Sequence, residues 1–108
     1  MSEPVILGFT VRNKVLKKDL ITPFNSMEAG SGQTYTASFQ LDEEWHGYSC
    51  VACFITEHKT YYVPLVSGSA IVPTEVLQYK KFAVSVVGQK GSTRISTNEN
   101  QVIQTGGK

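Results

Sequence analysis

The pattern of apolar residues constrains the fold of this chain more than any other feature. It alternates or runs in short blocks and nowhere follows helical spacing. Residues 34–41 alternate most clearly, with apolar side chains on one face and hydroxyl or amide side chains on the other. Similar segments recur at short intervals between turn residues. About eight such strands in 108 residues predict an all-β fold, a two-layer antiparallel β-sandwich, with a small closed barrel as the competing architecture.

The length predicts a single domain over residues 1–108, because two separate cores would each be too small to be stable. Charged residues make up 18% of the sequence, too few for a disordered chain, and no apolar run is long enough for a membrane-spanning helix. The net charge of +1 gives no general attraction to nucleic acid or to an anionic membrane. The first residues lack the features of a signal peptide, so we expect synthesis in a cytoplasm and no membrane partner.

Three segments depart from the strand pattern. Residues 13–33 combine lysines with a Gly-Ser-Gly tract and predict a flexible loop or arm, with one short strand near 15–21. Pro73 fits the first position of a helix, so we expect one short helical turn near residues 73–78. Residues 106–108 are expected to form a loose C-terminus.

Two cysteines, Cys50 and Cys53, have the spacing of a redox or zinc motif. Their neighbours are typical of a strand, on which positions three apart point to opposite faces, so the sulfurs are expected to diverge. A zinc site would need two further ligands, and the sequence has no second cysteine pair. We therefore expect two reduced, buried thiols.

The densest polar cluster consists of Asp42, Glu43, Glu44 and His46. These side chains could bind a metal ion, but the segment has no glycine at a calcium-loop position and no alternate-residue Asp/Asn spacing, so an exposed corner that keeps a sheet edge charged explains them better. The sequence has no nucleophile elbow, phosphate-binding loop or dinucleotide fingerprint, and Gly88 and Gly91 fit a hairpin turn. We expect no enzymatic activity, no catalytic or metal-binding residue and no cofactor.

A basic patch is a further possibility, since Lys80 and Lys81 lie close to aromatic residues and Lys90 and Arg94 follow. Phe82, however, starts an alternating strand that is expected to face the core. Lysines are also common on edge strands, where they oppose aggregation. We therefore expect no nucleic-acid partner.

Tyr61 and Tyr62 form a possible contact surface. They are adjacent on a predicted strand and must face opposite sides, so one of them is expected to face solvent. Exposed tyrosines suit both carbohydrate stacking and protein contacts. Tyrosines are also ordinary core material in a small sandwich, so this pattern leaves both functions open.

The second half of the sequence carries a series of short motifs. They are an acidic corner followed by Trp45, the turn Pro73-Thr74-Glu75-Val76-Leu77, the strand Phe82-Ala83-Val84-Ser85-Val86-Val87-Gly88 and the segment Thr93-Arg94-Ile95-Ser96-Thr97-Asn98. Over residues 42–105 the chain resembles a small Ig-like β-sandwich module of tail and baseplate structural proteins from bacteriophages of Gram-positive bacteria.

The resemblance implies structural roles for the matching residues. Trp45 fills the core, residues 73–77 close one end of the sandwich, and Thr97-Asn98 turns the chain into the last strand. The predicted structural core comprises Trp45, Phe54, Pro73, Leu77 and Phe82. The implied function is a virion structural protein that binds other virion proteins or copies of itself and reaches the virion after synthesis in the bacterial host. The alternative function is a carbohydrate-binding module for host-surface glycans, with Tyr61 and Tyr62 as contact residues.

Overall fold

The computed structural model describes residues 5–19 and 34–104, so the predicted arm beyond residue 19 and the C-terminus at 106–108 lie outside it. Within the described residues the strands are β1 (Val5–Arg12), β2 (Val15–Lys18), β3 (Tyr35–Leu41), β4 (Ser49–Ile55), β5 (Thr60–Pro64), β6 (Ser69–Ile71), β7 (Lys81–Lys90), β8 (Thr93–Ser96) and β9 (Asn100–Ile103). Two short 3₁₀ helices, η2 (Glu43–Trp45) and η3 (Val76–Gln78), interrupt them.

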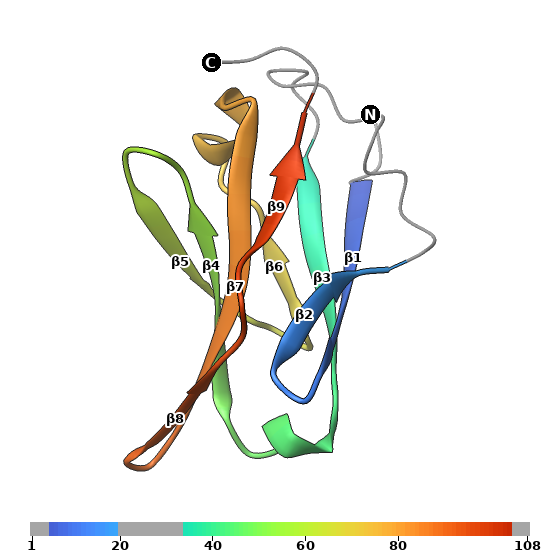
Figure 1. Ribbon diagram of the computed structural model, residues 1–108, viewed down its shortest axis with the longest axis vertical. Coiled ribbons are helices and arrows are strands. Elements are labelled where there is room, and N and C mark those ends of the chain that lie inside the picture. The colour runs from blue at the N-terminus through green and yellow to red at the C-terminus, as the bar shows by residue number, and fades with distance from the viewer. Residues whose placement is uncertain (1–4, 20–33, 105–108) are drawn as a thin grey trace.

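The strands form two sheets that pack face to face (Figure 1). One sheet has four strands in the order β2-β1-β3-β6, and the other has five, in the order β5-β4-β7-β8 with β9 also paired to β7. Side chains that alternate along each strand meet between the sheets and form the core. The prediction of an all-β, two-layer sandwich is confirmed.

One pair of neighbouring strands departs from the predicted antiparallel arrangement. β1 runs parallel to β3, which places Phe9 opposite Phe39 with their rings stacked 5.2 Å apart. Parallel neighbours need a connection of a dozen or more residues, and the sequence between Arg12 and Tyr35 is long enough to supply it. The wholly antiparallel prediction is wrong at this pair, and the Ig-like subtype stays a prediction.

The segment that follows β1 is a tight hairpin rather than the beginning of a loop. Asn13 and Lys14 have φ angles of 52° and 62°, and Arg12 pairs with Val15 across them. Positive φ at both central residues is typical of a two-residue hairpin turn, and asparagine adopts it at little cost. The short strand predicted near residues 15–21 is present as β2, and residues 13–14, predicted as part of the arm, form the turn before it.

Four of the five predicted core residues, Trp45, Phe54, Leu77 and Phe82, are buried, and Pro73 is half-buried. Phe54 and Phe82 pack on each other with ring centroids 6.5 Å apart. The remaining core comes mainly from the inward-facing residues of the strands: Leu7, Phe9, Val11, Leu16, Tyr35, Ala37, Phe39, Ala52, Ala70, Val72, Val76, Val84, Val86 and Val102.

Trp45, which is predicted to fill the core, is buried in a short 3₁₀ helix. It lies in η2, in the corner between β3 and β4 at one end of the sandwich (Figure 1). Gly88 of β7 makes room for its ring, because a Cβ at that position would lie 3.0 Å from Cζ3 of Trp45. A side chain at position 88 would require the Trp45 ring and Cβ of Tyr48, which would lie 3.2 Å from the new Cβ, to shift by a few tenths of an ångström, and this crowding explains a glycine within a long central strand.

The helical turn predicted near residues 73–78 is confirmed as η3, in which Val76 and Leu77 are buried. Its end is held by Gln104, whose buried Nε2 donates to the carbonyl oxygens of Leu77 (3.2 Å) and Tyr79 (2.8 Å). The turn is therefore fixed on one side by apolar burial and on the other by a glutamine distant in sequence. The second helical turn, η2, was not expected.

The segment between β8 and β9 does not reverse the chain as the resemblance implied. Both strands run antiparallel to β7, and the pairing register shifts by one residue between them. Such a shift is the signature of a β-bulge, in which the extra residue leaves the ladder. Thr97 stays attached to β7 by its backbone N–H to Val86 and by its hydroxyl, while Asn98 turns its side chain toward the other sheet.

Candidate contact surface

The two lateral sides of the sandwich, where the edges of the two sheets face each other, differ in construction. We call the side formed by β2 and β9 the sealed side. There the backbone N–H of Leu16 donates to Oδ1 of Asn98 at 2.7 Å, and Nδ2 of both Asn98 and Asn100 donates to the carbonyl oxygen of Leu16 at 3.3 Å. Side chains of the five-stranded sheet thereby form hydrogen bonds with backbone groups of β2, the edge strand of the four-stranded sheet.

We call the opposite side, formed by β5 and β6, the open side. Large apolar side chains are exposed on it: Val66 is 75% exposed and Ile71 is 63% exposed. Ile6, which is 60% exposed, extends this surface, because it pairs with Thr36, which in turn pairs with Ile71. Contiguous exposed apolar residues on a small domain typically mark an interaction site.

A shallow hollow lies at the centre of the open side. It has a volume of about 300 Å³ and is lined by Thr36, Val63, Pro64, Val66, Ser69, Ala70 and Ile71. None of these lining residues is ionisable. We call the lining residues together with Ile6 the open-side patch. An uncharged hollow of this kind fits an apolar side chain from another polypeptide better than a charged ligand.

The two tyrosines predicted as contact residues face opposite sides of their strand, as expected. Tyr62 is 67% exposed on the outer face of the five-stranded sheet, directly opposite Cys53 of β4. Tyr61 is half-buried against the core, and Nζ of Lys59 lies 5.0 Å from its ring centroid. The structure therefore leaves Tyr62 available for contacts and does not join the pair into one platform.

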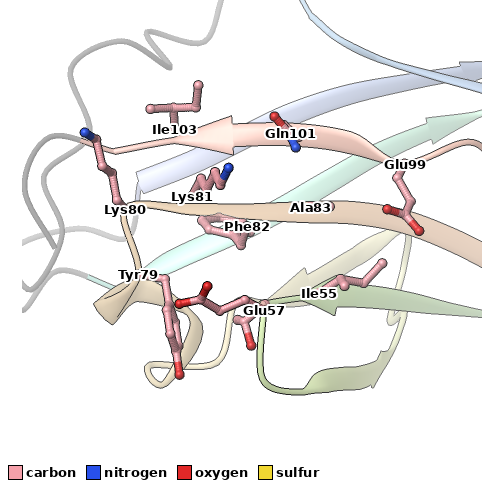
Figure 2. A pocket seen from close by; sticks show the side chains of 11 residues that line it. Ile55, Glu57, Tyr79, Lys80, Lys81, Phe82, Ala83, Glu99, Gln101 and Ile103 are labelled. Atoms are coloured by element: carbon pink, nitrogen blue, oxygen red, sulfur yellow. The ribbon is translucent and has the colours of Figure 1, made fainter. Parts of the chain in front are cut away.

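A second depression, which we call the groove, lies on the outer face of the five-stranded sheet (Figure 2). It has a volume of about 460 Å³. Its apolar lining includes Ile55, Ala83 and Phe82, whose ring packs in the core. The remaining lining residues are Thr56, Glu57, Tyr79, Lys80, Lys81, Glu99, Gln101 and Ile103. Carboxylate, amide and ammonium groups around an aromatic ring are a usual combination in sites for small polar ligands.

The carboxylates of the acidic corner bind the turn between β1 and β2 of the same chain. Oδ2 of Asp42 accepts the backbone N–H of Asn13 at 3.0 Å, and Nζ of Lys14 pairs with Glu44. The hydrogen bond that the Lys14 ammonium donates to the Glu44 carboxylate raises the pKa of Lys14 above its ordinary value. Within the described residues, no group of three or more His, Cys, Asp or Glu side chains is placed to hold a metal ion.

The basic residues considered for nucleic-acid binding are separated by the fold. Lys81 opens β7 and Lys90 closes it, so these two residues lie about 30 Å apart at the usual rise of a strand. Nζ of Lys90 lies 5.8 Å from the ring centroid of Tyr48, and Arg94 follows on β8. The structure thus does not gather these residues into one patch.

The cysteine sulfurs diverge from β4, as the strand pattern predicted. Cys53 is buried on the outer face of the sheet, while Cys50 is half-buried against the core. Burial raises the pKa of the Cys50 thiol above its ordinary value of 9.0. Both thiols are free.

In the described part of the chain, no helix is long and apolar enough to cross a membrane.

Sequence reasoning missed the residues that distinguish the two sides. Asn98 and Asn100 read as turn residues, because their partner, Leu16, lies more than 80 positions away in the sequence. The open side does leave a signal: in the short strand β6 the small Ala70 faces the core and the large Ile71 faces solvent. A strand that places its small apolar side chain in the core and its large one in solvent is a reason to expect a contact on the outer face.

The chain is similar to solved structures but not to any family model or curated protein. No family model matches the sequence, and no curated protein matches it. Among solved structures, the chain is similar to the N-terminal domain of phage TP901-1 ORF48, with a TM-score of 0.48 and 13% sequence identity. The superposition covers 92% of this chain and 95% of that chain. At this identity and TM-score we draw no functional inference from the likeness.

Proposed function

We propose that this chain is a structural module of a phage virion, in the tail or baseplate, that acts through protein–protein contacts and has no catalytic role. The observation that carries the proposal is the open-side patch, in which the exposed side chains of Val66 and Ile71 line a hollow that has no ionisable lining residue. The sequence motifs over residues 42–105 support the virion setting, since they resemble modules of such proteins.

The contrast between the two sides supports a contact function for the patch. On the sealed side, Asn98 and Asn100 satisfy the edge of β2 from within the chain. On the open side, Val66 and Ile71 stay exposed, and burying such side chains against a partner is favourable. Assembly proteins need this combination, because each copy must be stable alone and still present an apolar surface to its neighbours.

Immunogold electron microscopy on purified phage particles tests the virion role. An antibody raised against this chain should label particles at one constant position, and a tail or baseplate position should carry the label. Label on the head would replace the tail assignment with a capsid role. Protein found only in the soluble lysate, with unlabelled particles, would overturn the proposal.

A pair of matched substitutions tests the surface. Val66→Asp places a charge in the open-side patch, whereas Val15→Asp places the same charge at an exposed valine of β2, on the sealed side. In a phage that carries the variants, Val66→Asp should reduce incorporation into particles at least tenfold, and Val15→Asp should leave it unchanged. Equal incorporation of both variants would remove the open-side patch from the proposal.

Glycan recognition is the second candidate function, and the groove favours it. Tyr79 provides an aromatic ring next to Glu57, and Gln101 lies across β7 from them (Figure 2). The carboxylate accepts hydrogen bonds and the amide both donates and accepts them, as neutral sugars require. Tyrosine fluorescence and NMR shifts would be followed while host cell-wall polysaccharide is added. Loss of a response in Tyr79→Ala, but not in Tyr62→Ala, would place sugar in the groove; no response in the unmodified chain would exclude this function.

A further inference from the structure

Strand β5 is an edge strand whose outward backbone groups can be assigned from its pairing with β4. The backbone N–H of Leu65 donates to the carbonyl oxygen of Cys50, and the N–H of Thr56 donates to that of Lys59. Hydrogen-bonded pairs alternate along an antiparallel ladder, so Tyr61 and Val63 direct their backbone groups toward β4. The backbone groups of Thr60, Tyr62 and Pro64 consequently point away from the sheet.

The open edge of β5 therefore presents N–H donors at Thr60 and Tyr62 and carbonyl acceptors at Thr60, Tyr62 and Pro64. Pro64 has no N–H, so pairing cannot continue fully past it. β5 is terminal in the sheet order and lies at the margin of its sheet in Figure 1. An edge of this kind accepts an extended strand from another polypeptide.

We propose that β5 pairs antiparallel with β5 of a second copy of this chain, with Thr60 of each copy opposite Tyr62 of the other. This register uses both free N–H groups and the carbonyl groups of the same two residues, which gives four backbone hydrogen bonds around a twofold axis at Tyr61. A register with Tyr62 opposite itself would also allow four bonds, but it would direct the ring of each Pro64 at the carbonyl oxygen of Thr60 in the other copy, which would then have no donor.

The side chains also fit this pairing. Each exposed Tyr62 lies beside a Thr60 of the other copy, and aromatic residues next to β-branched residues are favourable cross-strand neighbours. Lys59 lies opposite Val63, so no like charges meet across the pair. The charge pattern of β5 is therefore compatible with its own copy.

The pairing is continuous with the open-side patch. Pro64 and Val66 continue directly from the paired residues of β5, so they come to lie beside the 56–59 turn of the second copy. The second copy thus covers part of the exposed apolar surface as well as the strand edge. This inference deepens the proposed function by naming the partner of the open side, and it rests on that function for its setting in the virion.

Backbone amide exchange measured by NMR on the purified chain tests the pairing directly. The N–H groups of Thr60 and Tyr62 should exchange rapidly in dilute protein and become at least tenfold slower as the concentration is raised toward about 1 mM. Those of Tyr61 and Val63 should be protected at every concentration, since they bond to β4. A monomer throughout this range, or a dimer in which Thr60 and Tyr62 still exchange rapidly, would overturn the proposal.

A matched pair of variants separates the contribution of the Tyr62 backbone N–H to association from that of the Tyr62 ring. Tyr62→Pro removes both the ring and the outward N–H, whereas Tyr62→Ala removes the ring and keeps the N–H. Analytical ultracentrifugation should show at least tenfold weaker association for Tyr62→Pro than for Tyr62→Ala. Equal association would overturn the strand pairing; if Tyr62→Pro does not fold, the exchange measurement on the unmodified chain still decides.

The test distinguishes this inference from the proposed function, because it uses the purified chain and the labelling experiment uses particles. Labelled particles together with a chain that does not dimerise would remove the β5 pairing and leave the virion role in place. A dimer that pairs through β5, together with unlabelled particles, would keep the pairing and remove the virion role.

Discussion

The sealed side and the open side of the sandwich solve the same structural problem in different ways. Each sheet ends in an edge strand on either side, and an edge exposes backbone groups that bind other chains. On the sealed side, Asn98 and Asn100 cross to Leu16 and occupy its backbone groups. On the open side, the edge of β5 and the neighbouring Val66 and Ile71 stay accessible.

The difference teaches that stability and association are assigned to separate parts of one small domain. The sealed side uses polar side chains whose partners lie within the chain, so its substitutions should affect folding. The open side uses apolar side chains that are exposed in the single chain, so its substitutions should affect folding little and binding strongly. The expected effects of substitutions on the free energy of unfolding therefore decrease from the core that both sides share, through the sealed side, to the open side.

The largest effect is expected in the core that both sides share. Gly88→Val should lower the free energy of unfolding by about 3 kcal/mol, because its side chain must occupy the space of the Trp45 ring. Urea denaturation measures this loss. In the Trp45→Leu background the crowding ring atoms are absent and Cβ of Tyr48, 3.2 Å from the new Cβ, remains, so the same substitution at Gly88 should cost much less; an undiminished cost would show that Tyr48, not the Trp45 ring, requires the glycine.

The next effect breaks the sealed side. Asn98→Ala should lower the free energy of unfolding by about 1–3 kcal/mol, because the N–H of Leu16 loses its partner. Asn100→Ala should cost less, since Asn100 supplies only one of the two bonds to the Leu16 carbonyl. Gln101→Ala, which truncates an exposed amide on the same strand, is the control for both and should be near neutral. An unchanged free energy of unfolding in Asn98→Ala would mean that water replaces the asparagine and that the bonds to Leu16 do not stabilise this side.

A smaller effect on stability is expected on the open side. Ile71→Ser should change the free energy of unfolding by no more than about 0.5 kcal/mol, because the side chain is already exposed in the single chain. Ala70, its neighbour in β6, is buried, and Ala70→Ser should be clearly more destabilising in the same denaturation series. If Ile71→Ser costs as much as Asn98→Ala, the open side contributes to folding and the division of roles between the two sides fails.

The sequence predicted the features of the fold that depend on local periodicity. Alternation along residues 34–41 placed Tyr35, Ala37 and Phe39 on the buried face, and Pro73 correctly marked the start of the turn that buries Leu77. Each of these outcomes depends on neighbours a few residues apart, for which strand and helix spacing is informative.

The features that position the contact surface depend on distant neighbours, and periodicity does not report them. The parallel neighbours β1 and β3, the bonds of Asn98 to Leu16 and the space that Gly88 leaves for Trp45 all join distant parts of the chain. Burial and exposure also follow from sheet order, so Ile71 could not be assigned to an open edge before that order was known. The same physical limit explains why Asp42 was considered as a metal ligand, although it accepts the N–H of Asn13.

The smallest predicted effect concerns Cys50, which lies on β4 next to β5 and packs against the core. Burial raises the pKa of this thiol above 9.0, so the folded chain holds its proton at a pH where the unfolded chain has lost it. Unfolding then releases a proton, and stability should fall slightly as pH rises above about 9. Cys50→Ser should remove this pH dependence, and alkylation of Cys50 near pH 7.5 should be slower in the folded chain than in urea. Rapid alkylation of the native chain would show that the region beside β5 is more open than its packing against the core implies.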